Sequence, residues 1–126
     1  MSKDILIIIR HGPYGGFHAA EGLRHANGAI SLRFRSIVVL VDDGVYLAKT
    51  DQNPGQSEWL ALSETLEEIM ARGLYEKKDA PAEFYVEKES LLKRGLDAEE
   101  LVESLELIDQ QGVSHLMATN GLQLIF

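Results

Sequence analysis

The chain has 126 residues, of which 45% are hydrophobic, with a formal net charge of -8 at pH 7 and no cysteine. Its length predicts a single domain, residues 1–126, with enough apolar side chains to bury a core. The negative charge argues against a direct nucleic-acid partner, and the lack of cysteine excludes disulfides, thiolate nucleophiles, persulfide carriers and cysteine-based metal sites.

Membrane segments and export signals leave recognisable patterns in a sequence. No apolar run approaches the roughly 20 residues that span a bilayer. The start of the chain, MSKD, lacks the basic and then apolar plan of a signal peptide. We therefore expect a cytoplasmic protein without a membrane partner.

The first half of the chain alternates between predicted strands and helices. Residues 5–9 form an unbroken Ile/Leu run, which is typical of a strand buried on both faces of a parallel sheet. Apolar residues at helical spacing predict a helix over residues 17–32, and residues 36–41 form a second apolar strand. A turn-rich loop over residues 49–56 leads to a second helix, with Ser57 as its N-cap and Gly73 as its C-cap.

The second half repeats this alternation with shorter elements. It contains predicted strands at residues 83–86, 105–108 and 122–126, and predicted helices at residues 90–94 and 113–119. Gly95 is expected to stop the first of these helices, and Asp97 and Glu100 have the spacing of a capping box for another short turn. Strands that alternate with helices predict an α/β fold, in which a mainly parallel five-stranded sheet is covered by helices on both faces.

Several polar residues and glycines follow the predicted strands at their carboxyl ends. Ligands of open α/β sheets bind beyond these ends, so the residues there are candidates for a pocket. They are His11, Gly12, Tyr14 and Gly15 after the first strand, Asp43 and Gly44 after the second, and Glu87 after the third. Any open α/β fold places some polar residues at these ends, so their position alone does not assign a function.

Arg10, His11 and Gly12 directly follow the first strand, a setting that suggests a histidine phosphatase. In that chemistry the histidine is the nucleophile and arginine binds the phosphate. A second histidine and an acid are also needed, but the one late histidine, His115, lies within a predicted helix. A three-residue match is short, and we rank this interpretation below a solvent-facing loop histidine.

Two further groups of polar residues invite a metal or phosphate interpretation. His18, Glu21 and His25 share one face of the predicted helix, but such a row is more often a polar face in which Glu21 and His25 interact across one turn. The paired Asp42 and Asp43 lack the residue order of a phosphoacceptor site, and Asp43 followed by Gly44 fits a tight turn. We therefore expect no metal and no other cofactor.

Five segments, taken in order and spacing, make the chain recognisable. They are GPYGGFHAAEGL at residues 12–23, VVLVDDGVYLA at 38–48, NPGQ at 53–56, SLLKRGLD at 90–97 and GLQLIF at 121–126. Together they resemble the DsrE/DsrF-like family, which includes the TusB, TusC and TusD sulfur-relay subunits and YchN-like proteins. The resemblance spans nearly the whole chain. It implies a three-layer α/β/α sandwich that assembles into dimers, trimers or hexamers.

One departure from the family pattern limits the function that the resemblance implies. The catalytic branch of the family carries a sulfur-accepting cysteine at the end of the third strand, and the matching position here is Glu87. Glutamate cannot form a persulfide. The resemblance therefore implies a non-catalytic, TusC/DsrF-like subunit associated with sulfur relay, in a homo-oligomer or a hetero-oligomer with other DsrE-like subunits. Leu91, Leu92, Tyr75 and Tyr85 are candidates for an oligomer surface, with ordinary core packing as the alternative.

A second class of function stays open beside this one. The strand-end residues His11, Tyr14, Asp43 and Glu87 come from three different predicted loops, as the residues of α/β sites usually do. A small-ligand-binding protein or an enzyme could use them, and a Glu87 carboxylate near His11 could act in general acid–base catalysis. We favour the subunit without catalytic activity over this alternative.

Overall fold

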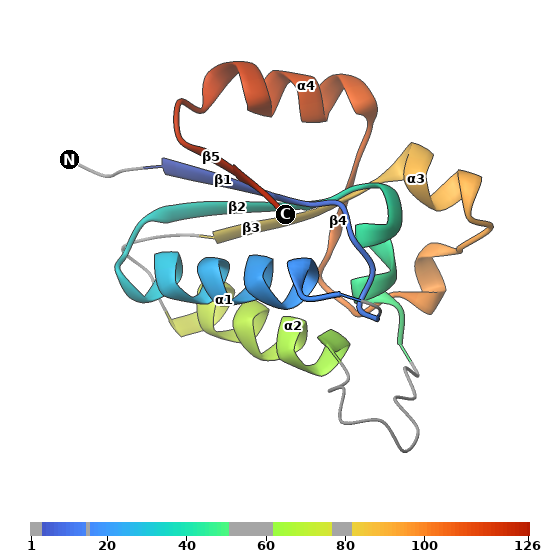
Figure 1. Ribbon diagram of the computed structural model, residues 1–126, viewed down its shortest axis with the longest axis horizontal. Coiled ribbons are helices and arrows are strands. Elements are labelled where there is room, and N and C mark those ends of the chain that lie inside the picture. The colour runs from blue at the N-terminus through green and yellow to red at the C-terminus, as the bar shows by residue number, and fades with distance from the viewer. Residues whose placement is uncertain (1–3, 15, 51–61, 77–81) are drawn as a thin grey trace.

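The computed structural model describes residues 4–14, 16–50, 62–76 and 82–126 (Figure 1). Gly15, the predicted cap Ser57 and most of the predicted loop at 49–56 lie outside the described residues. Five strands form one sheet in the order β4-β3-β2-β1-β5, and every pair of neighbours is parallel. The strands are β1 (Asp4–Ile9), β2 (Arg35–Leu40), β3 (Ala82–Glu87), β4 (Glu106–Ile108) and β5 (Gln123–Ile125).

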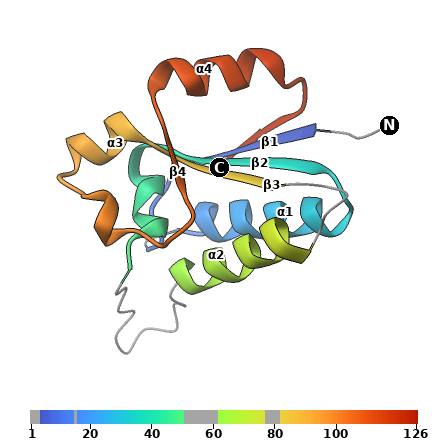
Figure 2. The ribbon, with the colours of Figure 1, turned by 180° about the vertical axis from the view of Figure 1, so that it is seen from behind.

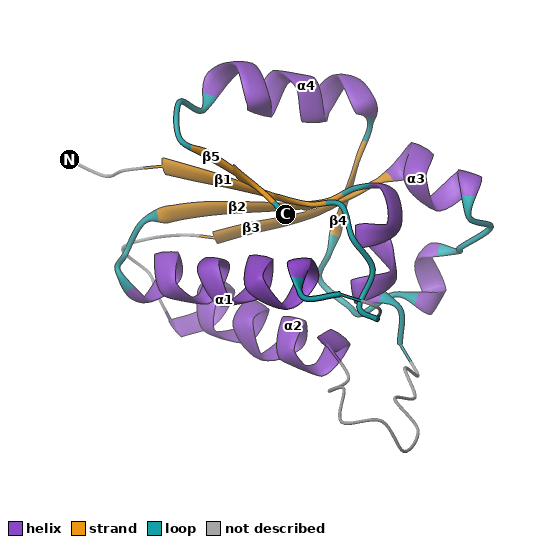
Figure 3. Ribbon diagram, viewed as in Figure 1, coloured by secondary structure: helices purple, strands orange, loops and turns teal. Residues whose placement is uncertain are grey.

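Helices cover both faces of this sheet and confirm the predicted three-layer α/β/α fold (Figures 1 and 2). The α-helices are α1 (His18–Ser31), α2 (Leu62–Ala71), α3 (Lys88–Lys93) and α4 (Gln110–Thr119). Helices α1 and α2 lie on one face and α4 on the other, as the purple ribbons of Figure 3 show. Every expected strand and α-helix is present among these elements, and where both ends are described their bounds differ from the expected ones by at most three residues.

The alternation of side chains along β1 explains why its whole length is apolar. Ile5, Ile7 and Ile9 belong to the core between the sheet and helices α1 and α2. Leu6 and Ile8 belong to a smaller core under α4. Because successive side chains of a strand point to opposite faces, a strand covered on both sides needs apolar residues at every position.

The chain after β2 does more than make the tight turn expected at Asp43 and Gly44. The Gly44 N–H donates to the Val41 carbonyl oxygen over 2.8 Å, which closes the turn, and the chain continues as a 3₁₀-helix, η1 (Asp42–Ala48). Gly44 passes so close to β1 that a Cβ atom there would lie 2.0 Å from the Ile9 carbonyl oxygen. Glycine is therefore needed for a close backbone approach, which fixes η1 against the end of β1.

The expectation that Gly73 is a C-cap is wrong. After α2 the chain continues into a π-helical turn, η2 (Arg72–Glu76), and Gly73 lies within it. A Cβ atom on Gly73 would lie 2.9 Å from the Cβ atom of Ala82, so the glycine allows the turn to pack against the start of β3. Gly95, in contrast, has a φ of 63° directly after α3, and this left-handed conformation confirms that it stops the helix.

Side-chain caps set the starts of two elements in the second half. Asp97 and Glu100 form both hydrogen bonds of the predicted capping box around the short 3₁₀-helix η3 (Ala98–Glu100). Asp109 caps α4 by accepting a hydrogen bond from the Gly112 N–H over 2.7 Å. Helix α4 therefore begins at Gln110, three residues before the apolar Val113 from which periodicity predicted it.

An ion-pair network joins β1, β2 and β3 at the amino ends of the strands. Arg35 pairs with Asp4 over 3.2 Å and with Glu83 over 2.7 Å. The Tyr85 hydroxyl donates to Glu83 Oε1 over 3.0 Å. Partial burial, followed by the neighbouring Glu83 carboxylate, raises the pKa of Tyr85 to about 12. A tyrosine phenol is already protonated at neutral pH, and the raised pKa keeps that of Tyr85 protonated beyond its ordinary value of 10.0.

We expect the Tyr85 phenol to titrate near pH 12 in the folded chain. The folded state favours the protonated phenol, so its contribution to stability is complete below the ordinary pKa of 10.0 and is lost as the pH rises towards about 12. Phenolate absorbance followed against pH measures this, and Tyr85→Phe identifies the component that belongs to Tyr85. Glu83→Gln is expected to lower the pKa. If the absorbance component that Tyr85→Phe removes has the ordinary tyrosine pKa of about 10, the raised pKa of Tyr85 would be contradicted.

None of the helices in the described part of the chain combines the length and the apolar character needed to cross a membrane.

Candidate functional site

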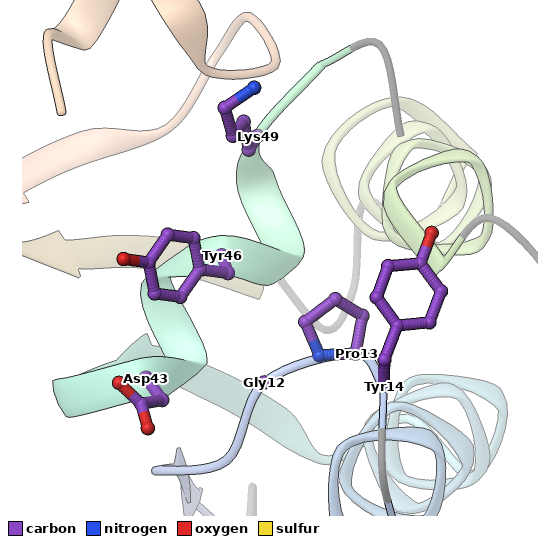
Figure 4. A pocket seen from close by; sticks show the side chains of 6 residues that line it. All are labelled: Gly12, Pro13, Tyr14, Asp43, Tyr46 and Lys49. Atoms are coloured by element: carbon purple, nitrogen blue, oxygen red, sulfur yellow. The ribbon is translucent and has the colours of Figure 1, made fainter. Parts of the chain in front are cut away.

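Two cavities at the carboxyl ends of the strands contain residues that were expected there, one on each face of the sheet. The first, called here the tyrosine cavity, has a volume of about 430 Å³. It is lined by Gly12, Pro13, Tyr14, Asp43, Tyr46 and Lys49, and Figure 4 shows that these residues come from the loop after β1 and from η1 with the residue that follows it. The second, called the Glu87 cavity, has a volume of about 320 Å³ and lies under α4.

The tyrosine cavity brings together three of the residues expected at the strand ends, Gly12, Tyr14 and Asp43. Tyr14 is exposed. The Asp43 carboxylate pairs with Arg94 of the segment after α3 over 2.9 Å, so its charge is compensated at the rim of the cavity. With two tyrosines and a proline in its wall, this cavity presents more apolar than polar surface.

Sequence reasoning missed Tyr46 and Lys49. Both follow Asp43 at steps of three residues, and a 3₁₀-helix has three residues per turn, so this spacing places Asp43, Tyr46 and Lys49 along one side of η1. The signal was present in the sequence, but the segment 42–48 was interpreted only as a turn. Recognising that segment as a short helix is the step that would have found them.

Glu87 lies in the other cavity. Glu87 is only 9% exposed, and its Oε1 atom accepts a hydrogen bond from the Ser90 hydroxyl. The Ser90 hydroxyl oxygen in turn accepts a hydrogen bond from the Asp42 N–H over 2.8 Å. This chain of hydrogen bonds links the ends of β2 and β3 to the first turn of α3. The structure therefore separates Glu87 from Gly12, Tyr14 and Asp43.

His11 and Gly44 also lie apart from both cavity walls. His11 is exposed and stacks on His18 at the start of α1, with ring centroids 4.3 Å apart and an interplanar angle of 20°. Gly44 is buried against β1, where it serves the close approach to Ile9. Arg10, the neighbour of His11, pairs with Asp42 over 3.3 Å. Gly15 lies outside the described residues.

On α1, the Glu21 side chain is hydrogen bonded to Arg24, a residue that was not included in the predicted row of His18, Glu21 and His25. Arg24 donates to the Glu21 carboxylate over 2.7 Å, and this hydrogen bond lowers the pKa of Glu21. His25 Nδ1 donates to the backbone oxygen of Glu21 over 2.8 Å and lies 4.0 Å from its carboxylate. Within the residues that the structure describes, no three or more histidines and carboxylates form a group that could hold a metal ion.

The architecture defines the class of this protein: a small three-layer α/β/α domain with a parallel sheet and cavities at the carboxyl ends of its strands. Over residues 3–125 the chain matches the DsrE/DsrF-like family, and it belongs to that family. It is 30% identical over 119 residues to the Protein TusC homolog of Pseudomonas aeruginosa, a match that covers 93% of this chain and 92% of the relative. It is also 32% identical over 103 residues to an uncharacterized protein of Methanopyrus kandleri, with 82% and 77% of the two chains covered.

Solved structures show the same fold. The crystal structure of the YchN protein from E. coli matches with a TM-score of 0.80 and 20% sequence identity over 100% of both chains. A protein of unknown function from Methanobacterium thermoautotrophicum matches with a TM-score of 0.72 and 16% identity, over 99% of this chain and 100% of that one. At these identities the comparison confirms the fold, while the family assignment rests on the sequence match. The chain is thus a TusC-like member of the DsrE/DsrF-like family.

Proposed function

We propose that this chain is a non-catalytic subunit of a cytoplasmic sulfur-relay assembly. The observation that carries the proposal is Glu87 at the carboxyl end of β3, where the catalytic branch of the family places its sulfur-accepting cysteine. A carboxylate cannot accept a sulfur atom to form a persulfide, and the chain has no cysteine anywhere to replace it. The role that is left within such an assembly is structural or regulatory.

Exposed apolar side chains near both edges of the sheet support a subunit that assembles with others. On α3, which follows β3, Leu92 is 70% exposed, and on the edge strand β4 Leu107 is 52% exposed. Near β5, Leu122 and Ile125 are exposed as well. Of the side chains suggested for such a surface, Leu91 is buried in the core, Tyr85 is half-buried, and the Tyr75 side chain lies outside what the structure describes. Leu92 is exposed and therefore available for contact with another subunit. The partner is a second copy of this chain or another DsrE-like subunit.

The solution mass of the purified chain tests this role. We expect sedimentation velocity at micromolar concentration to give at least a dimer, either alone or after mixing with a DsrE-like subunit that carries the cysteine. Leu92→Gln is expected to shift the distribution towards smaller species because it removes exposed apolar surface. Lys93→Gln, at the next exposed position of α3, is the matched control and is expected to leave the mass unchanged. A monomeric wild-type chain, both alone and after mixing with the cysteine-bearing subunit, would contradict the proposal.

The alternative of an enzyme with His11 and Glu87 as an acid–base pair gains no support from the geometry. His11 stacks on His18, and Glu87 is hydrogen bonded to Ser90 in the cavity under α4. A phosphatase built on Arg10 and His11 gains none either. Arg10 is paired with Asp42, and the late histidine, His115, is exposed on α4.

A further inference from the structure

Glu87 is a buried carboxylate without a cationic partner. The residue is about nine-tenths buried, and the one hydrogen bond of its side chain among the described residues is the one from the Ser90 hydroxyl to Oε1. None of the ion pairs formed within the described part of the chain includes it. Buried carboxylates in proteins are normally paired with a cation, because taking the charge out of water is costly. A cation at this place would stabilise the structure.

The Glu87 cavity leaves room for such a cation next to the carboxylate. Its polar wall consists of Glu87 itself, Arg10, Asp42 and Gln110. Arg10 and Asp42 form an ion pair and cancel each other, and Gln110 is neutral. The cavity wall therefore has a net charge of one negative unit, which belongs to Glu87.

The remaining wall of the cavity is apolar. It is formed by residues at the carboxyl ends of β1, β2 and β5 and by residues of α4, namely Ile8, Val41, Ile125, Val113 and Met117. Val113 is buried, whereas Met117 and Ile125 are exposed at the rim. A volume of about 320 Å³ is at the small end of the range for ligand pockets, so a compact ligand with a hydrocarbon body fits it.

We propose that the Glu87 cavity binds a small amphipathic monocation, a primary ammonium group on a short hydrocarbon chain, with the ammonium group at the Glu87 carboxylate. An ammonium group suits the site better than a guanidinium group. Ser90 already donates to Oε1, so a bidentate guanidinium fork would have to share that oxygen, whereas an ammonium group can bind Oε2 alone. A free alkylamine and the side chain of a lysine from another protein share this chemistry. The inference does not depend on the proposed role in sulfur relay.

Titration of the intact chain with n-pentylammonium chloride tests this site, and 1-pentanol serves as the neutral probe of similar shape. We expect saturable chemical-shift changes at the backbone amides of Glu87, Val113 and their neighbours. We also expect the ammonium compound to bind at least about tenfold more tightly than the alcohol, because a charge-assisted hydrogen bond is lost with the alcohol. Equal affinities of the two probes, or no saturable change with either, would overturn the proposal.

Variants that remove one negative charge test whether the preference for the ammonium probe depends on Glu87. Glu87→Gln keeps the shape and an acceptor for Ser90 but removes the charge, so we expect it to lose the preference for the ammonium probe. Glu106→Gln removes the same charge from an exposed residue of β4 outside the cavity and is expected to bind like the wild type. Unchanged binding by a folded Glu87→Gln chain would overturn the assignment. If that variant does not fold, the comparison of the two probes on the wild type still decides.

A further probe distinguishes the two sources of the ammonium group. Nα-acetyl-lysine amide carries the lysine side chain with its backbone charges blocked. If it binds at least as tightly as n-pentylammonium, a lysine of a partner protein can fill the site. If only the free amine binds, the occupant is a small amine. Either result supports an ammonium site, whereas failure of both compounds would overturn it.

Discussion

Replacing Gly44 by alanine is expected to destabilise the chain by about 3 kcal/mol or more. The new Cβ atom would lie 2.0 Å from the carbonyl oxygen and 2.7 Å from the carbonyl carbon of Ile9. Both are backbone atoms of a central strand, so relief of the clash requires η1 to move away from β1. That movement would also disturb the wall of the tyrosine cavity, because Asp43 and Tyr46 lie on η1. Urea denaturation gives the free energy of unfolding.

Gly28→Ala is the matched control for this prediction. Gly28 lies inside α1, and a Cβ atom there would meet no atom within 4 Å apart from its chain neighbours and the nearby backbone of the helix itself. We expect this variant to be more stable than the wild type by about 0.5–1 kcal/mol, because alanine restricts the unfolded chain and favours helix. Similar free energies of unfolding for the two variants would contradict the close approach described for η1. Both are measured at one protomer concentration, because assembly adds to stability.

Leu23→Ala is expected to cost about 2–5 kcal/mol of stability. Leu23 is fully buried between α1 and the sheet, and its removal leaves a cavity in the larger of the two cores. Leu32→Ala makes the same chemical change at a side chain that is 72% exposed, and we expect a change within about 0.5 kcal/mol. Equal losses of stability in the two variants, measured by urea denaturation, would contradict the burial pattern of α1.

The strands and α-helices were predictable because their patterns are local. The unbroken apolar runs of β1 and β2 predict strands covered on both faces, and the structure has them. The segment after β2 was harder, since Asp42 to Gly44 favours a turn and the apolar residues behind it are too few to show a helical period. The prediction of the C-terminal end of α2 failed for a different reason. Gly73 is required by tight packing against Ala82, which no local pattern reveals.

The candidate site was predictable only in part, because the face on which a strand-end residue lies depends on tertiary structure. Along β3, Phe84 and Val86 point to the core of α1 and α2, while Tyr85 packs in the core under α4. Glu87 follows Tyr85 by two residues and therefore lies on the α4 face. The sequence predicts this alternation, but it does not reveal which helices cover which face. Residues from three strand ends were therefore assigned to one pocket. The structure places Gly12, Tyr14 and Asp43 in one cavity and Glu87 in another, with His11 and Gly44 in neither wall.

The most direct test of the central claim is to locate sulfur in the assembly by native mass spectrometry. The chain is mixed with a cysteine-bearing DsrE-like subunit from the same organism, and glutathione persulfide is supplied as the sulfur donor. We predict a complex that contains both chains, with the mass of added sulfur on the cysteine-bearing subunit and the unmodified mass on this one. The account would be contradicted if this chain stayed monomeric both alone and in the mixture, while the cysteine-bearing subunit took up sulfur without binding it.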